Sequence, residues 1–126
     1  MALALEEKTT NKGVMVMEKY IIVKTQFEGF HCWPNAPTEV MFLRNSHRHI
    51  FYVVAKIPIT SDRQLEFFIV KKTIDDYIKS IYIGPDASCE SIAENIAKYI
   101  QEAYQIRTDI TVQVFEDNEN GAEVHI

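Results

Sequence analysis

The stretch HRHIFYVVAKIPIT, residues 47–60, contains the longest β-strand signal in the chain, because β-branched and aromatic side chains dominate it. Successive side chains of a strand point to opposite faces, so His47 and His49 are expected on one face, where both imidazoles reach the same point. By itself, a His-x-His pair on a strand more often serves packing or a surface role than metal binding. A third histidine, His31, follows an earlier predicted strand. Three histidines leave a zinc ion one open coordination position.

On both sides of this strand, predicted strands and helices alternate with loop-forming residues. Residues 18–29 predict a strand that ends at a glycine, and residues 39–45 predict a short helical turn after a loop with two prolines. Residues 65–81 and 89–104 have apolar side chains at helical spacing, and residues 84–86 separate them. Ser88 is the expected N-cap of the second helix.

Two apolar stripes predict the helix faces that reach the core. The first helix has apolar residues at helical spacing over most of its length: Phe67, Val70, Ile74, Tyr77, Ile78 and Ile81. The second has Cys89, Ile92, Ala93, Ile96, Ala97, Ile100, Ala103 and Tyr104 on one stripe.

The C-terminal part predicts a hairpin. Residues 109–116 alternate, with Ile110, Val112 and Val114 on one face. Residues 118–121 have turn chemistry, and residues 122–126 form a last short strand. The order β-β-α-α-β-β predicts an α+β fold, an antiparallel four-stranded sheet with two helices on one face. Its long sheet edges favour pairing with further copies of the chain.

Length and charge exclude several classes of protein. We expect one domain over residues 18–126, preceded by a flexible N-terminal extension of residues 1–17. A net charge of −5 argues against bulk binding to nucleic acid or to an anionic membrane, and no apolar run approaches the length of a membrane span. Two cysteines, Cys32 and Cys89, form no disulfide framework and favour a cytoplasmic location.

Four short motifs in this order resemble the T-fold superfamily, and within it the 6-pyruvoyltetrahydropterin and 6-carboxytetrahydropterin synthases. FEGFH at residues 27–31 and HRHIF at residues 47–51 are similar to the family's Phe-x-Ala-x-His and His-Gly-His-x-aromatic motifs. ASCESIA at residues 87–93 is similar to Pro-Thr-x-Glu-Asn-Leu-Ala, and VQVFED at residues 112–117 to Val-x-Val-x-Glu-Thr. The resemblance covers residues 18 to about 120, nearly the whole predicted domain.

The resemblance implies a zinc ion held by His31, His47 and His49, and a glutamate, Glu116, that anchors a planar heterocycle. A carboxylate accepts two parallel hydrogen bonds, so it can recognise the amino-pyrimidinone edge of purine-like and pterin-like molecules. The resemblance also implies a homo-oligomer with pockets between subunits. Further candidate ligand-binding residues are Glu90 in the third motif, Phe30 and Trp33 for stacking, and Arg44 and Arg48 for phosphate.

The chain departs from the family where the enzymes transfer protons. Leu43 occupies the position of the family's cysteine base, four residues before the paired histidines. The family's Asp-His relay between the two helices has no counterpart, because no histidine occurs between Ile74 and Ser88. General acid–base catalysis needs a positioned group of suitable pKa. The resemblance therefore implies retained metal and ring-anchor positions without the proton-transfer positions.

We predict a binding protein that captures a purine-like, pterin-like or nucleotide-derived small molecule without lyase chemistry. Short chains of this kind are also similar to phage-encoded proteins, which implies an anti-defence sponge for a signalling nucleotide as one use. The first alternative is a zinc-dependent lyase of the pterin synthase type, with Glu39, Cys32 or a neighbouring subunit supplying the base. The second is a structural protein that keeps only the fold.

Overall fold

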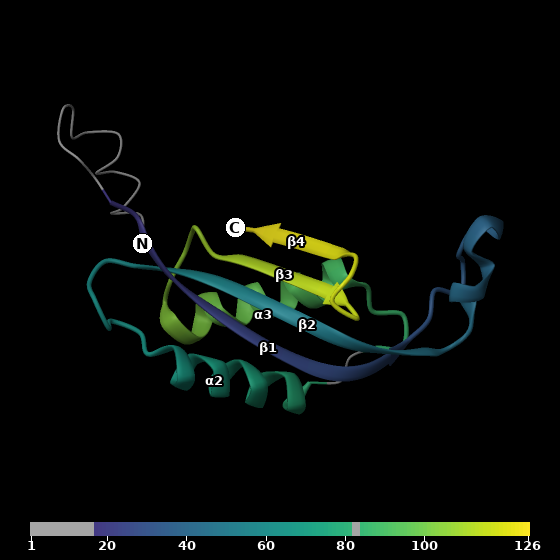
Figure 1. Cartoon of the computed structure of the whole chain (residues 1–126), viewed down its shortest axis with the longest axis horizontal. Coiled ribbons are helices and arrows are strands. Elements are labelled where there is room, and N and C mark those ends of the chain that lie inside the picture. The colour runs from purple at the N-terminus through teal and green to yellow at the C-terminus, as the bar shows by residue number, and fades with distance from the viewer. Residues whose placement is uncertain (1–16, 82–83) are drawn as a thin grey trace.

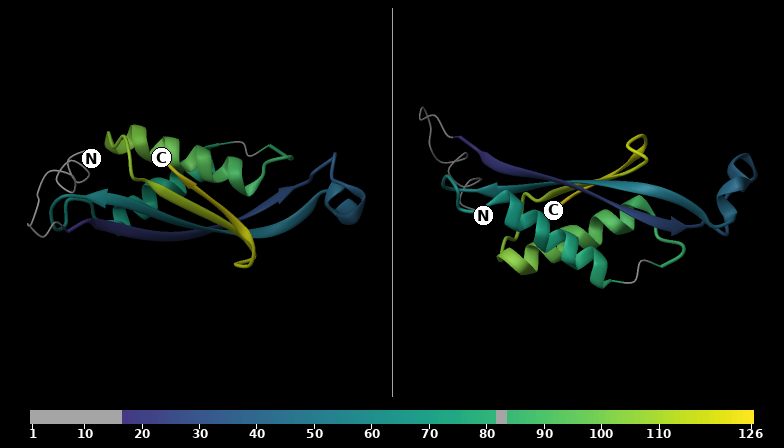
Figure 2. Two further views of the ribbon diagram at one scale, coloured as in Figure 1. Left: turned by 90° about the horizontal axis from the view of Figure 1, so that it is seen from above. Right: turned by 60° about the horizontal axis from the view of Figure 1, so that its bottom comes forward.

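The computed structural model describes residues 17–81 and 84–126 and confirms the α+β fold and the order of the elements. Four antiparallel strands form one sheet, and two helices cover one face of it (Figure 1; Figure 2). The strands are β1 (Lys19–His31), β2 (His47–Ile59), β3 (Thr111–Glu116) and β4 (Gly121–His125). The helices are α2 (Phe67–Ser80) and α3 (Cys89–Tyr104), with a 3-10 helix, η1 (Thr38–Arg44), between β1 and β2.

The sheet order follows the chain order, β1-β2-β3-β4, so β2 and β3 are central and β1 and β4 form the edges. β1 and β2 pair along 13 residues each, and this register sets His31 opposite His47. On the other side of β2, Phe51 lies opposite Glu116, the last residue of β3. The register therefore brings the ends of three strands to one corner of the sheet.

The core lies between the sheet and the helices. Alternate residues of the two central strands are buried against α2 and α3: Phe51, Val53, Ala55, Ile57, Val112 and Val114. Ile110, predicted to share their face, is also buried. The α3 stripe is confirmed for its first six members, Cys89, Ile92, Ala93, Ile96, Ala97 and Ile100, whereas Ala103 is exposed and Tyr104 is half-buried.

Both helices begin at side-chain caps. The Ser88 hydroxyl accepts a hydrogen bond from the Ser91 amide, and the Ser91 hydroxyl accepts one from the Ser88 amide, so the predicted N-cap of α3 is confirmed. In α2, the Glu66 carboxylate caps the helix and Val70, Ile74 and Ile78 are buried. Phe67, the first apolar residue of the predicted pattern, lies outside the core, since it is 51% exposed. The packed surface of α2 begins one turn later, at Val70.

The β3–β4 hairpin depends on its backbone conformation. Asp117 and Asn118 both adopt positive φ angles, 53° and 58°, as tight hairpin turns require. At Gly121, an added Cβ would lie 2.1 Å from the carbonyl oxygen of Val114, so glycine is needed there. The turn predicted at residues 118–121 is therefore confirmed, and it holds Asp117 beside β2, where the Asp117 amide donates to the carbonyl of Ile50.

The helical turn expected at residues 39–45 is η1, which lies beyond the end of the paired strands (Figure 1). None of its residues is buried, and the side chains of Met41 and Phe42 are mostly exposed. Of the predicted N-terminal extension, residues 1–17, only Met17 falls within the described residues, and it is exposed. In the described ranges, no helix combines the length and the apolar character that crossing a membrane demands.

Candidate metal centre

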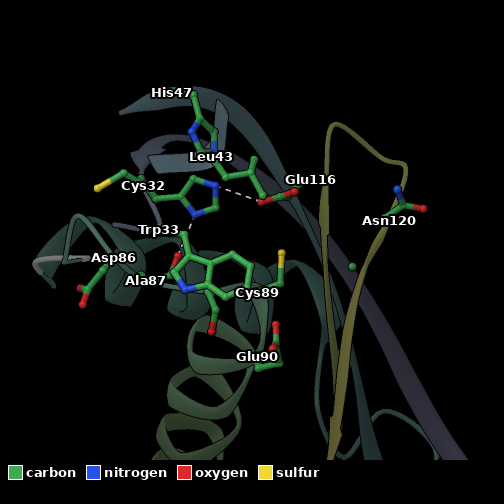
Figure 3. A pocket seen from close by; sticks show the side chains of 13 residues that line it. Cys32, Trp33, Leu43, His47, Asp86, Ala87, Cys89, Glu90, Glu116 and Asn120 are labelled. Atoms are coloured by element: carbon green, nitrogen blue, oxygen red, sulfur yellow. Dashed lines mark hydrogen bonds and ion pairs between the residues drawn. The ribbon is translucent and has the colours of Figure 1, made fainter. Parts of the chain in front are cut away.

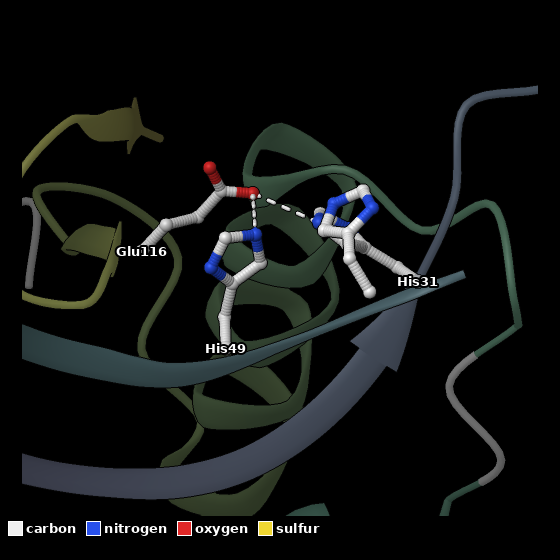
Figure 4. A group of neighbouring side chains, drawn as sticks. His31, His49 and Glu116 are labelled. Carbon is white, nitrogen blue, oxygen red and sulfur yellow. Dashed lines mark ion pairs between the residues drawn. The ribbon is translucent and has the colours of Figure 1, made fainter. Parts of the chain in front are cut away.

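Three histidines and one glutamate meet where β1, β2 and β3 come together. One potential ligand atom from each of His31, His47, His49 and Glu116 lies within 4.8 Å of the corresponding atoms of the others. Figure 4 shows the carboxylate of Glu116 directed at the rings of His31 and His49. The predicted histidine cluster is thus assembled, and these four side chains form what we call the metal cluster.

The sheet register explains why these four side chains meet. His31 and His47 are partners across β1 and β2, and His49 shares the face of His47 by strand alternation. Glu116 is the partner of Phe51, which is two residues beyond His49 on the same face of β2. A residue distant in sequence is therefore a diagonal neighbour of His49 in the sheet.

The outer nitrogens of the three imidazoles are tied to fixed acceptors. Nδ1 of His31 lies 2.7 Å from the carbonyl oxygen of Ala87, and Nδ1 of His47 lies 2.8 Å from the carbonyl oxygen two residues before it. Nδ1 of His49 lies 2.7 Å from the carboxylate of Asp117. Carbonyl and carboxylate oxygens accept, so each Nδ1 carries the hydrogen and donates it. In the neutral ring, Nε2 then presents a lone pair to the cluster.

The atoms that face one another are consequently all acceptors. Nε2 of His31 is 3.0 Å and Nε2 of His49 is 3.6 Å from Oε2 of Glu116. Within the described chain, both Nε2 atoms are buried without a hydrogen-bond partner. Buried acceptors left in this state cost free energy that a cation between them would recover. Three imidazoles and a carboxylate form a ligand set that zinc accepts, so the residues fit the ion that the resemblance implies.

The spacing supports this fit. Zinc–nitrogen and zinc–oxygen bonds of about 2.0–2.2 Å place two ligands of a tetrahedral ion roughly 3.3–3.5 Å apart. The two distances from the Glu116 carboxylate, 3.0 Å and 3.6 Å, bracket this value. The family resemblance assigns Glu116 to a heterocycle and gives no sign of its place in the metal cluster, because only the β2–β3 register reveals it.

Asp117 supports the cluster from outside. Its carboxylate accepts from Nδ1 of His49 and from the backbone amide of Ile50, which ties the hairpin turn to β2. The hydrogen bond from His49, and then that from Ile50, lower the pKa of Asp117, so it is a carboxylate at neutral pH. It therefore fixes the ring orientation of His49 and the hydrogen on Nδ1. Nothing in the sequence motif indicated this role.

We expect Asp117→Ala to weaken zinc binding by roughly 10–100-fold, because a metal-ligating histidine loses its outer hydrogen-bond partner. A competition titration against a chromophoric chelator measures the change. Asp62→Ala is the matched control, because Asp62 is an exposed carboxylate paired with Lys19 far along β1 from the cluster. Equal zinc affinities for wild type and Asp117→Ala would contradict the supporting role.

The cluster opens into a cavity of about 510 Å³ between the end of β1, the start of α3 and the β3–β4 turn (Figure 3). This volume lies within the range of small-molecule sites. Three predicted ligand-binding residues, Trp33, Glu90 and Glu116, line the cavity together with His31 and His47. Its other lining residues include Cys32, Leu43, Asp86, Ser88, Cys89 and Asn120.

The structure does not bring Phe30, Arg44 and Arg48 to this cavity. Phe30 adjoins His31, and Arg48 lies between His47 and His49, so strand alternation turns both to the opposite face of the sheet. There Arg48 forms an ion pair with Glu28. The guanidinium of Arg44 donates to the carbonyl of Ala36. The alternation that grouped the histidines was already a sequence signal against Phe30 and Arg48 as neighbours of the cluster.

The cavity offers two thiols. Burial, and then the negative charges of Glu116 and Glu90, raise the pKa of Cys89 to about 12, so its thiol stays neutral at physiological pH. Cys32 is half-buried at the end of β1, where its amide donates to the carbonyl of Pro85. Leu43, at the position of the family's cysteine base, lines the cavity with an apolar side chain.

The sequence was compared with models of protein families and with curated proteins, and neither comparison finds a match.

Proposed function

We propose that this protein captures a planar, nitrogen-rich heterocycle in a zinc-centred pocket and releases it chemically unchanged. The ligand class is purine-like, pterin-like or nucleotide-derived. The observation that carries the proposal is the convergence of three histidines and Glu116 in one cluster, of which His31, His47 and Glu116 line a cavity of about 510 Å³. Sequestration of a signalling nucleotide is one use to which such capture would be suited.

The metal cluster would hold zinc through Nε2 of His31, His47 and His49. A bound zinc ion supplies a positive charge that attracts and polarises a ligand oxygen. The histidines are positioned for this task, since each Nδ1 donates to a fixed acceptor and each ring is held in place.

The cavity wall provides complementary recognition. Glu116 can accept two parallel hydrogen bonds from an amino-pyrimidinone edge. Trp33, 50% exposed, lines the same cavity and offers an indole face for stacking. Glu90, at the start of α3, adds a second acceptor for ring or amino hydrogens. A carboxylate that binds the edge of a ring, an aromatic face and a cation together favour a flat polar heterocycle over an aliphatic ligand.

The residues around the cavity favour capture over turnover. Leu43 cannot exchange a proton, and the Cys89 thiol is neutral and a poor base. The cluster histidines are committed through both ring nitrogens when zinc is bound. Cys32, a candidate base of the lyase alternative, also lines the cavity, so the lyase enters as an outcome of the test.

We also propose that the chain forms a homo-oligomer through its sheet edges. β1 is a 13-residue edge strand, a length that natural proteins seldom leave unpaired. Ile22 and Phe30 project from its outer face and are more than half exposed, as are Met41 and Phe42 of η1. Exposed apolar side chains around an open edge are typical of an interface between copies.

The test uses the single tryptophan of the chain as a reporter. Zinc-loaded protein is titrated with dihydroneopterin triphosphate and, separately, with GTP while Trp33 fluorescence is recorded. We expect saturable quenching by at least one probe, because Trp33 lines the cavity. Glu116→Ala should abolish the quenching. Glu119→Ala, which removes an exposed carboxylate from the same hairpin turn, should retain it.

Native mass spectrometry of the same samples, followed by denaturation, reports subunit number, zinc content and the mass of the released probe. A released probe of unchanged mass supports capture. Loss of triphosphate or a new pterin mass would instead establish the lyase. Absence of quenching and of any bound probe would refute the proposed ligand class.

A further inference from the structure

Glu116 differs from the other members of the metal cluster because nothing else holds its functional group. Each histidine is fixed at Nδ1 by a carbonyl or carboxylate oxygen. In the part of the chain that the structure describes, no N–H or O–H group donates a hydrogen bond to the Glu116 carboxylate, whose contacts are with Nε2 of His31 and His49. Only the backbone of Glu116 is fixed, by pairing in β3 and by the hydrogen bond that its amide donates to the carbonyl of Asn120.

The Glu116 side chain also has room to move. It is 32% exposed, compared with 11% for His31 and 18% for His49, and it lines the open cavity as well as the cluster. Rotation about its side-chain torsions alone can carry the carboxylate from the histidines into the cavity. Cys89 and Glu90, on the cavity wall opposite the turn, offer no competing cation that would hold it in either place.

We propose that Glu116 is an exchangeable fourth protein ligand, which closes the zinc site while the cavity is empty and leaves it when a ligand enters. The entering ligand is the heterocycle of the proposed function, so this part of the inference rests on that proposal. Closure of the empty site depends only on the metal cluster. The Glu116 carboxylate is the group that would bind zinc and also the group that would accept hydrogen bonds from a heterocycle. It cannot do both at once, so the two states exclude each other. Ligand capture is then coupled to the opening of one coordination position.

This assignment predicts that the loss of Glu116 changes two binding affinities in opposite directions. Removing Glu116 should destroy capture of a heterocycle that depends on the carboxylate. The same change should improve binding of a small ligand that needs only the open metal position. A residue that merely lines the cavity, or merely supports the fold, would not move these two properties in opposite directions.

The experiment uses cobalt(II) in place of zinc, since cobalt reports its coordination number by its visible absorption, and imidazole as the probe. Imidazole binds metals through its neutral form, so a change in site charge alters its affinity less than it would alter that of an anionic probe. Wild type is compared with Glu116→Gln and with Glu116→Asp, which keeps the charge but shortens the side chain by one methylene. Glu119→Gln is the control for a lost carboxylate elsewhere in the hairpin turn.

We expect half-saturation by imidazole at a concentration at least about tenfold lower in Glu116→Gln and Glu116→Asp than in wild type, because no protein ligand must be displaced. Their cobalt spectra before imidazole should also differ from that of wild type, and Glu119→Gln should match wild type.

Identical spectra and identical imidazole affinities in wild type and both Glu116 variants would overturn the closure while leaving heterocycle capture standing. Failure of the wild-type protein to bind cobalt would overturn the closure together with the metal part of the proposed function. Capture, measured separately by Trp33 quenching, and the mass of the released probe, measured by native mass spectrometry, keep the two failures apart.

Discussion

Replacing His31 with alanine is expected to abolish stoichiometric zinc binding. The His31 side chain is 11% exposed, compared with 18% for His49, and its Nε2 lies 3.0 Å from the Glu116 carboxylate. Loss of an outer hydrogen-bond partner alone costs roughly 10–100-fold in metal affinity, so loss of a direct ligand should exceed about 100-fold. The chelator competition used for Asp117→Ala measures the change.

The same substitution separates metal binding from folding. Zinc at about 100 times its dissociation constant should stabilise the wild-type fold by about 2.7 kcal/mol, because only the folded chain assembles the cluster. His31→Ala should show no such zinc-dependent rise in unfolding temperature. His125→Ala is the control, since His125 lies on the exposed edge strand β4 and contacts Thr111 and Asp109 rather than the cluster. Equal zinc-dependent stabilisation of wild type and His31→Ala would contradict the assignment.

Phe51→Ala is expected to cause the largest loss of stability, about 3–5 kcal/mol in the free energy of unfolding. Phe51 is 1% exposed and stacks on Phe27 with ring centroids 5.2 Å apart. Its ring also packs edge-on against His31 and His49, at centroid distances of 5.3 Å and 5.8 Å. The substitution therefore leaves a cavity beneath the metal cluster, and zinc affinity should fall with stability. Urea denaturation with and without zinc measures both effects.

Phe68→Ala is the matched control for this substitution. Phe68 is the same residue type, but it is 71% exposed at the start of α2. Its loss should change the free energy of unfolding by less than about 0.5 kcal/mol, as for ordinary surface substitutions. If Phe51→Ala does not fold, Phe51→Leu replaces it in the experiment. A Phe51→Leu protein with undiminished stability and zinc affinity would show that Phe51 does not support the cluster.

Local patterns in the sequence were sufficient for the elements of this fold. The alternation in residues 47–60, the apolar stripe over residues 89–104 and the turn residues before Gly121 each specify a structure within a few residues of where it occurs. Their order then limits the arrangement to a sheet with helices on one face. Phe67 shows the limit of this reasoning, because helical spacing gives the face of a helix but not where its packing begins.

The sequence by itself determined the elements of the fold and the chemical types at its centre, three histidines on strand faces that can meet. Only the tertiary structure decided that Glu116 joins them, that Asp117 fixes His49, and that Trp33 and Glu90 share their cavity. The physical reason is register: strand periodicity is local, whereas the pairing of Phe51 with Glu116 joins residues separated by two helices and is set by burial of a common core.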